Sequence, residues 1–340
     1  MLIVGSGSIG MRHLRIAREL MPNASIKFLR HGPTTTAIPL SDGYYTELKD
    51  ALEFEPEIAV IANPAPFHLE ITEALCGIGA HVLIEKPIAA TTEGIPELMN
   101  LVKSKQIVLK VGYNLRFLPS LMKFRELLSK EIIGKVLSVR CETGQYLPTW
   151  RPNSSYKDTV SAKSTLGGGV LLELSHEIDY LMWIFGKVDW VRATLSKQSD
   201  LEIDVEDTAH IVVGFESNHV TKQVIGSVNL DFIRHDSKRE CTALGDNGSL
   251  RWDGLSGTVE LIRAGASGPE VLFNQEPSQD ETYMEEWLEF LACITRGESS
   301  QATIQEAADV LDVIKAIRES AKTGNQVSVR HTLSEVGVAK

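Results

Sequence analysis

The 340-residue sequence lacks three features that would assign it to other classes of protein. It has no apolar run near the ~18 residues of a membrane-spanning helix, so we expect no membrane partner. Its four cysteines form no CxxC pair, which argues against a zinc site and a disulfide framework, and we expect no metal. A basic surplus is also missing. The net charge of −11 makes nucleic acid an unlikely partner, because phosphate binding needs a basic surface.

The charge that is present is unevenly distributed. Residues 1–120 hold 11 basic and 12 acidic groups, whereas residues 121–340 hold 23 and 33. The near-neutral first third can accommodate an anionic ligand. The start of the chain has no signal-peptide pattern, and we expect a cytoplasmic protein. The first strand has only three residues before Gly5, which raises the question of whether the natural chain begins a few residues earlier.

Two patterns of secondary structure divide the sequence. Up to about residue 115, short apolar strands alternate with amphipathic helices, which predicts an α/β fold with a Rossmann doubly wound parallel sheet. Longer alternating runs follow and predict an α+β domain with a large open, mostly antiparallel sheet. We therefore expect a Rossmann domain at 1–117 and a second domain at 118–330. Two helices, at about 281–295 and 304–321, close the chain.

A glycine pattern follows the first apolar strand and precedes the first helix. In Gly5-x-Gly7-x-x-Gly10, the glycines permit a tight turn and a close approach of backbone to a pyrophosphate. The helix N-terminus supplies amide donors to the phosphates. We predict a dinucleotide site formed by the following residues: Gly5, Gly7, Ser8, Ile9 and Gly10. The alternative is a purely structural turn.

The acidic residue that an NAD site usually has about 20 residues after the glycines is absent. Arg30 stands there, followed by His31 and by Thr34-Thr35-Thr36. A guanidinium can pair with a 2′-phosphate, so NADP is favoured over NAD. The alternative is a surface arginine that stacks on adenine without preference.

Several motifs together resemble one known family. They are Gly5 to Gly10 with Arg12-His13, Asn63-Pro64 with His68, Glu85-Lys86-Pro87, Gly112-Tyr113-Asn114-x-Arg116-Phe117, and Gly167-Gly168-Gly169 before His176-x-x-Asp179. The combination is similar to the glucose-fructose oxidoreductase / inositol dehydrogenase (Gfo/Idh/MocA) family, from residue 1 to about 328. The resemblance implies hydride transfer between a nicotinamide cofactor and a sugar or cyclitol carbon. It also implies a cofactor site that includes Asn63, Pro64, His68 and Glu85, and a last helix (304–321) that returns to the first domain. The second domain is implied to bind the substrate and to mediate oligomerisation, as a homodimer or homotetramer.

Lys86 is the candidate acid/base. It lies just after the strand 81–84, at the sheet edge where doubly wound folds bind ligands. Alcohol oxidation needs a group that removes the hydroxyl proton as hydride leaves. Taken alone, Lys86 is best interpreted as a surface lysine in a loop, and it is the flanking Glu85 and Pro87, read with the family, that favour the catalytic role.

His176 is the second catalytic candidate. If 171–185 is one helix, Glu173, His176 and Tyr180 share a face opposite the apolar one. His176 would then assist Lys86 or bind the reacting hydroxyl, and Asp179 would orient it. The family usually places its acidic residue four positions before the histidine, whereas Glu173 stands three before. The role of Glu173 is therefore open, and a bland polar contact remains the alternative for His176.

An irregular segment before the glycine triplet is the candidate substrate-recognition element. Trp150, Arg151 and Tyr156, continuing to Ser161 and Lys163, combine aromatic rings that stack on sugars with cations that bind phosphate or carboxylate groups. Relatives with similar Trp-Arg-Pro and Glu-Leu-Ser-His-Glu-Ile-Asp motifs often act in surface-sugar biosynthesis, which favours an amino or nucleotide-linked sugar. Asn114 and Arg116 either reach the substrate or tie the domains together.

These observations predict an NAD(P)-dependent enzyme that acts on CH–OH groups of a small sugar-like molecule. Two alternatives remain. One is a glycosidase that oxidises its substrate only transiently with NAD, and the other is a cofactor-binding sensor without turnover.

Overall fold

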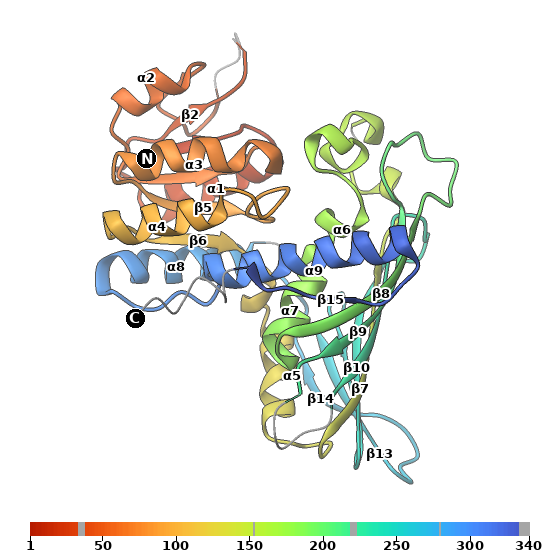
Figure 1. The fold of residues 1–340 in the computed structure, drawn as a ribbon. Helices are drawn as coiled ribbons and strands as arrows, with labels where there is room; N and C mark the ends of the chain where they lie inside the picture. The colour runs from red at the N-terminus through yellow and green to blue at the C-terminus, as the bar shows by residue number, and fades with distance from the viewer. Residues whose placement is uncertain (33–37, 152–153, 218–222, 279, 333–340) are drawn as a thin grey trace, which may run out of the picture. The chain divides into compact units, whose positions relative to one another are not determined.

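The computed structural model describes residues 1–32, 38–151, 154–217, 223–278 and 280–332, and it separates into two units (Figure 1). The first unit comprises Met1–Asn114 and Asp280–Ala308, and the second comprises Leu115–Gln279 and the chain from Asp309 onward. The sequence placed the boundary after residue 117 instead of after Asn114. Within the described chain, no helix is both long enough and apolar enough to cross a membrane.

The first unit is built on a six-stranded sheet in the order β3-β2-β1-β4-β5-β6, with every pair parallel. Its strands are β1 (Leu2–Val4), β2 (Lys27–Leu29), β3 (Tyr44–Tyr45), β4 (Ile58–Ile61), β5 (His81–Glu85) and β6 (Leu109–Gly112). Because the strand order reverses between β1 and β4, the carboxyl ends of these two strands border the crevice where doubly wound sheets bind ligands. This is the expected Rossmann-type sheet.

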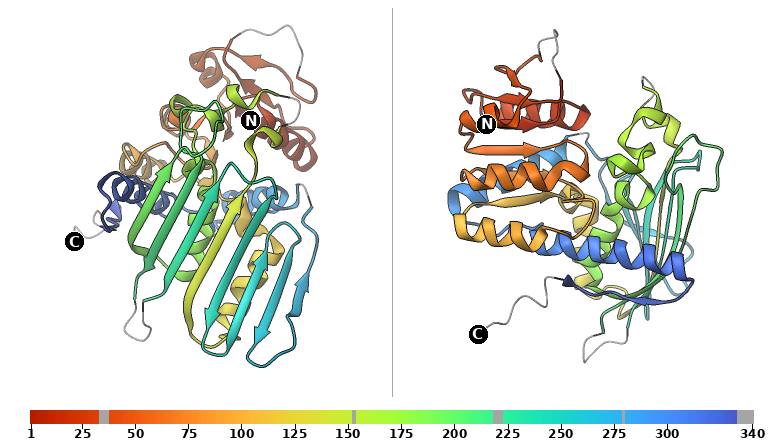
Figure 2. Two further views of the ribbon diagram at one scale, coloured as in Figure 1. Left: turned by 90° about the vertical axis from the view of Figure 1, so that its right-hand side faces the viewer. Right: turned by 45° about the horizontal axis from the view of Figure 1, so that its top comes forward.

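The described part of the first unit includes the helices α1 (Ser8–Leu20), α2 (Leu48–Glu53), α3 (His68–Gly77), α4 (Ile95–Lys105) and α8 (Glu281–Arg296). Figure 2 shows them against the six-stranded sheet. Helix α1 packs beside α8, and α3 beside α4. Leu14 of α1 and Trp287 of α8 share one buried cluster with Ile3, Val60 and Leu83 of the strands, so α1 and α8 cover the same face.

The segment that returns to the first unit differs from the expectation. We expected the last helix, at 304–321, whereas the returning segment is Asp280–Ala308, which contains α8. Most of the last helix, α9 (Ile304–Thr323), belongs to the second unit. Both helices have an apolar stripe, and a stripe does not specify which surface will cover it. Burial of Trp287 and Phe290 against the first sheet decides the matter.

The second unit contains a nine-stranded sheet in the order β14-β13-β12-β11-β7-β10-β9-β8-β15. Its strands are β7 (Val136–Gly144), β8 (Val188–Ser196), β9 (Thr208–Phe215), β10 (Ile225–Asp231), β11 (Lys238–Gly245), β12 (Gly248–Asp253), β13 (Thr258–Arg263), β14 (Glu270–Asn274) and β15 (Val327–Ser328). All neighbours are antiparallel except β7 and β10. The mostly antiparallel sheet confirms the expected fold class, although β12, β14 and β15 were not foreseen.

Helices α5 (Pro119–Ser129), α6 (Val170–Glu173) and α7 (Ser175–Phe185) also belong to the second unit. The expectation of one helix over 171–185 was wrong, because Leu174 interrupts it with φ −100° and ψ 29°. Tyr180 is fully buried, and its hydroxyl lies 3.1 Å from Cys141 Sγ, so it does not share an outward face with His176. His176 and Tyr180 lie one turn apart in the same helix, and Tyr180 is inward because it packs against Cys141 of β7 and Trp252 of β12.

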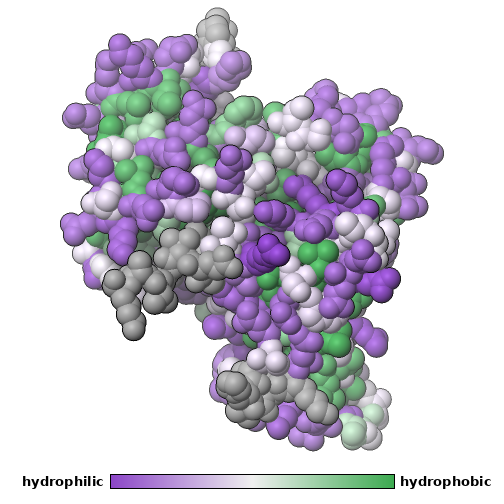
Figure 3. Space-filling view, viewed as in Figure 1, coloured by the Kyte–Doolittle hydropathy of each residue, from purple (hydrophilic) through white to green (hydrophobic). Residues whose placement is uncertain are grey.

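The view in Figure 3 shows hydrophilic and hydrophobic side chains intermixed over the surface that faces the reader. Large exposed hydrophobic side chains do occur on the second unit, among them Leu137, Val212 and Ile225.

Candidate functional site

The glycine turn between β1 and α1 has a different steric reason for each glycine. At Gly5, where φ is +94°, a Cβ atom would lie 2.7 Å from Ala62 O, at the end of β4. At Gly10, a Cβ would lie 2.0 Å from Gly5 O. At Gly7, the residue that precedes α1, nothing lies within 4 Å of a Cβ. Gly5 and Gly10 therefore close the turn, while Gly7 leaves space before the first amides of the helix, where Ser8 and Ile9 lie.

This turn fits a dinucleotide pyrophosphate. The space at Gly7 is of the kind that a backbone-bound phosphate needs, and the 13-residue helix α1 supplies amide donors and the positive end of its dipole. Asn63 follows β4, and its Oδ1 is buried with no hydrogen-bond donor among the described residues. Because a buried acceptor of this kind is costly unless it is satisfied, Asn63 Oδ1 is suited to a ligand hydroxyl or amide.

His68, at the start of α3, connects the ends of two neighbouring strands. Its Nε2 lies 2.6 Å from Asn63 O, and its Nδ1 lies 3.0 Å from Pro87 O. Burial lowers the pKa of His68, and the hydrogen bonds to the two carbonyl groups oppose that effect. The imidazole is almost completely buried. It therefore holds the Asn63-Pro64 segment, which follows β4, close to Pro87, which follows β5.

The Glu85-Lys86-Pro87 segment lies at the carboxyl end of β5. Glu85, the last residue of the strand, is buried, whereas Lys86 is half-buried. The Lys86–Pro87 peptide bond is cis. Lys86 is therefore located at the edge where a doubly wound sheet binds its ligands.

Arg30 directly follows β2. Its guanidinium carbon lies 5.8 Å from the centre of the Tyr44 ring, and its Nε is buried without an acceptor among the described residues. Thr34-Thr35-Thr36, which were expected to add donors, lie outside the described residues. Arg30 thus retains hydrogen-bonding capacity at the position where a dinucleotide ribose is usually read.

Arg116 and Asp179 form a buried ion pair within the second unit. The Arg116 guanidinium donates from Nη2 to Asp179 Oδ1 at 2.6 Å and from Nε to Oδ2 at 3.0 Å. Both side chains are at least 98% buried. The pair connects the 3₁₀ turn Asn114–Phe117 to α7. Asn114 is buried in the first unit, where its Nδ2 donates to Thr282 Oγ1 at 2.8 Å.

Glu173 and His176 flank the interruption at Leu174. Glu173 ends α6, His176 lies in the first turn of α7, and both side chains are half-buried. Lys86 belongs to the first unit and His176 to the second. That Asp179 orients His176 stays a prediction, and the Asp179 carboxylate accepts two hydrogen bonds from Arg116.

The predicted substrate segment is partly committed to the fold of the second unit. Trp150 Nε1 donates to Gln145 O at 3.0 Å, and the Tyr156 hydroxyl accepts from the Glu202 amide at 3.2 Å. Arg151 is exposed. Pro152 and Asn153 lie outside the described residues. The polar groups of the two rings are thus already used, while their faces and the Arg151 guanidinium are the parts that suit a ligand.

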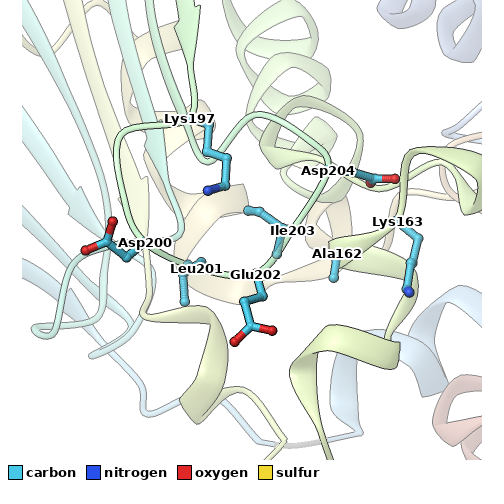
Figure 4. Close-up of a pocket in the computed structure, with 8 residues that line it drawn as sticks. All are labelled: Ala162, Lys163, Lys197, Asp200, Leu201, Glu202, Ile203 and Asp204. Atoms are coloured by element: carbon cyan, nitrogen blue, oxygen red, sulfur yellow. The ribbon is translucent and has the colours of Figure 1, made fainter.

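A cavity of about 380 Å³ lies beside this segment (Figure 4). Ala162 and Lys163 line it together with residues of the loop that follows β8. In Figure 4, Lys197 points into the ring formed by this loop, whereas the Asp200 carboxylate points away from it. The lining has two lysines against three carboxylates, so charge alone does not make it an anion site.

Sequence reasoning missed the structural roles of two buried polar residues of the first unit, His13 and Glu286. Trp287 donates to His13, which lies 274 positions earlier, and Glu286 is fully buried. No local pattern connects residues so far apart. The only signal at the sequence level was that His13 follows the glycine motif.

Comparisons with known families cover both parts of the chain. Residues 1–113 match "Oxidoreductase family, NAD-binding Rossmann fold", and residues 125–329 match "Oxidoreductase family, C-terminal alpha/beta domain", the two parts of the Gfo/Idh/MocA family.

Two curated relatives have named activities. Levoglucosan dehydrogenase from Pseudarthrobacter phenanthrenivorans is 35% identical over 147 residues, which are 42% of this chain and 37% of the relative. An NADP(+)-dependent scyllo-inositol 2-dehydrogenase from Bacillus subtilis is 22% identical over 296 residues, 81% of this chain and 79% of the relative. The chain thus spans well under two thirds of the first of these two proteins.

Solved structures share the fold along the whole chain. Levoglucosan dehydrogenase in complex with NADH superposes with a TM-score of 0.83 at 22% identity, over 97% of this chain and 98% of that one. The WlbA dehydrogenase from Bordetella pertussis, in complex with NADH and UDP-GlcNAcA, gives a TM-score of 0.79 at 20% identity, over 97% and 98%.

Proposed function

The chain belongs to the Gfo/Idh/MocA family of oxidoreductases, and we propose that it is an NAD(P)-dependent dehydrogenase of a sugar or cyclitol. The observation that carries this proposal is the glycine turn, in which Gly5 and Gly10 are closed by backbone while Gly7 leaves space before α1. Asn63 Oδ1, buried without a donor among the described residues, adds a hydrogen-bond acceptor beside the amide donors of that turn. When bound, the nicotinamide supplies hydride transfer, and this chain's residues handle the proton.

Lys86 is the proposed proton carrier. In the oxidation, the substrate carbon loses a hydride, the C–O bond becomes a carbonyl, and the hydroxyl proton passes to Lys86 Nζ. His176, at the start of α7, is proposed to bind the same hydroxyl or to relay its proton, with Glu173 beside it on the other side of the interruption at Leu174. The buried Arg116–Asp179 pair supports this assignment, because it anchors the helix that carries His176.

NADP is the proposed cofactor in preference to NAD. Arg30 offers a cation after β2 where NAD sites usually have a carboxylate, and its buried Nε has no acceptor among the described residues. A 2′-phosphate would provide such an acceptor. A relative named as NADP(+)-dependent and neighbours in complex with NADH show that both cofactors are used by similar proteins.

The proposed substrate is an amino or nucleotide-linked sugar. The exposed Arg151 guanidinium, which directly follows Trp150 and precedes Tyr156 in the sequence, suits a charged sugar derivative. WlbA, a protein of the same fold, was solved with a nucleotide-linked sugar.

We also propose a homodimer or homotetramer in the cytoplasm. Exposed Val212 and Ile225 on the adjacent strands β9 and β10 favour self-association, which light scattering would test.

The deciding experiment follows the absorbance of the reduced nicotinamide with NAD and NADP in parallel, against free, amino and nucleotide-linked sugars. We expect cofactor reduction with at least one of them. Lys86→Ala should abolish turnover but leave cofactor binding in place, whereas Lys105→Ala, a change of an exposed lysine on α4, should alter neither. Full activity of Lys86→Ala would remove Lys86 from the mechanism. Release of an aglycone without net reduction would favour transient oxidation in a glycosidase, and cofactor binding without turnover would favour a sensor.

A further inference from the structure

We propose that His13 is a positioning residue that, with Trp287 and Glu85, holds the backbone of Lys86 in place. The inference rests on the proposed role of Lys86 and concerns a hydrogen-bonded chain within the first unit. Trp287 Nε1 lies 2.9 Å from His13 Nδ1, and His13 Nε2 lies 2.9 Å from Glu85 Oε1. The second carboxylate oxygen, Glu85 Oε2, accepts the Lys86 amide at 3.2 Å.

The direction of each hydrogen bond follows from the first donor. An indole N–H can only donate, so His13 Nδ1 must accept. The proton of the neutral imidazole therefore sits on Nε2 and is donated to Glu85. A second proton on Nδ1 would meet the indole N–H and break the bond to Trp287. The chain thus specifies a single tautomer of His13.

The surroundings leave Glu85 little freedom. His13 and Trp287 are completely buried, and Glu85 is nearly so. On the β6 side, a Cβ atom at Gly112 would lie 3.3 Å from Glu85 Oε2, so the glycine provides the space that the carboxylate occupies. The Tyr283 ring packs edge-on against His13 with centroids 5.8 Å apart. Because His13 and Trp287 are completely buried, rotation of the carboxylate would leave polar groups unsatisfied.

The chain of hydrogen bonds connects the C-terminal segment that returns to the first unit with the backbone at Lys86. Helix α8 supplies Trp287, α1 supplies His13 directly after the glycine turn, and β5 ends in Glu85. The residue next to Glu85 is Lys86. A hydrogen bond made at position 287 is therefore transmitted through two side chains to the backbone of the proposed proton carrier.

The test compares two buried tryptophans. Trp287→Phe removes the donor to His13, and Trp252→Phe removes an equivalent buried hydrogen bond, to Ser120 Oγ at 3.0 Å in the second unit. Amide hydrogen exchange at Lys86 should become about tenfold faster in Trp287→Phe and stay unchanged in Trp252→Phe. Turnover of Trp287→Phe should fall in kcat while the KM for cofactor is retained. His13→Leu gives the same comparison if Trp287→Phe does not fold.

A spectroscopic measurement tests the chain without any substrate. The nitrogen chemical shifts of His13, assigned among the nine histidines by their loss in His13→Leu, should show a proton on Nε2 and none on Nδ1. A proton on Nδ1, or unchanged Lys86 exchange in both Trp287→Phe and His13→Leu, would overturn the proposal. Intact exchange effects without turnover on any sugar would instead refute the proposed function and leave the positioning of Lys86 standing.

Discussion

Replacing Glu286 with glutamine tests whether the raised pKa of this buried carboxyl group makes the stability of the protein depend on pH. Glu286 is fully buried, and neither carboxylate oxygen has a hydrogen-bond donor among the described residues. Burial raises the pKa of Glu286 well above its usual 4.5; the Lys110 ammonium opposes this effect, and the Glu85 and Glu289 carboxylates add to it. Glu286 therefore remains protonated in the folded protein at a pH where the unfolded chain has already lost that proton.

The sign of the pH dependence follows from proton counting. Above pH 4.5 the folded state binds more protons at this position than the unfolded state, so the free energy of unfolding falls as the pH rises. Each pH unit costs about 1.4 kcal/mol while the difference persists. The loss continues from the usual pKa up to the raised pKa of the folded state. Glutamine has nearly the same shape and no proton to retain, so Glu286→Gln should avoid this loss.

Urea unfolding at several pH values between 5 and 8, followed by tryptophan fluorescence, measures the effect. Glu286→Gln should unfold at a higher urea concentration than the wild type at pH 7, and the gap should narrow toward pH 5. Glu285→Gln, an exposed change on the same helix, should give no pH-dependent gap. A gap of the same size at pH 5 and pH 8, or a less stable Glu286→Gln at pH 8, would refute this account of Glu286.

Three further predictions concern other parts of the chain. Gly7→Ala, at a residue with φ −73°, should leave folding intact but weaken dinucleotide binding by about tenfold or more, measured by calorimetry. Gly10→Ala should fail to fold. Unchanged dinucleotide affinity of Gly7→Ala would contradict the binding of a phosphate in the space at Gly7. Arg30→Ser should lower affinity for NADP by about 10- to 100-fold with little effect on NAD, and equal losses for both would contradict recognition of the 2′-phosphate. Burial lowers the pKa of His331, but hydrogen bonds to Asp309 and to the Val188 carbonyl raise it on balance above 6.5. Pairing of the adjacent β15 with β8 should therefore weaken as the pH rises above 6.5. Hydrogen exchange should show falling protection of the β15 amides in the wild type but not in His331→Asn. Constant protection in the wild type would contradict this role of His331.

The glycine turn and the two kinds of sheet could be predicted from the sequence because they depend on local features. Steric permission at Gly5 and Gly10, and the spacing of apolar residues in short strands or alternating runs, are properties of neighbouring residues. The interruption at Leu174 was not visible in this way, because the apolar pattern continues across it. The inward position of Tyr180 was misjudged because its partners, Cys141 and Trp252, lie on strands distant from it in the sequence.

Local patterns predicted that Lys86 follows a strand and that His176 lies in a helix, and in the structure these are the end of β5 and the start of α7. The partners of the buried polar groups were decided only by the tertiary structure. Arg116 was expected to reach the substrate or to tie the domains together, and Asp179 to orient His176; the structure shows that the two bind each other within the second unit. The two closing helices carry similar apolar stripes, and only packing against the first sheet selects α8. Hydrophobic periodicity specifies that a face is buried, whereas a hydrogen bond between residues 274 positions apart depends on which surfaces meet.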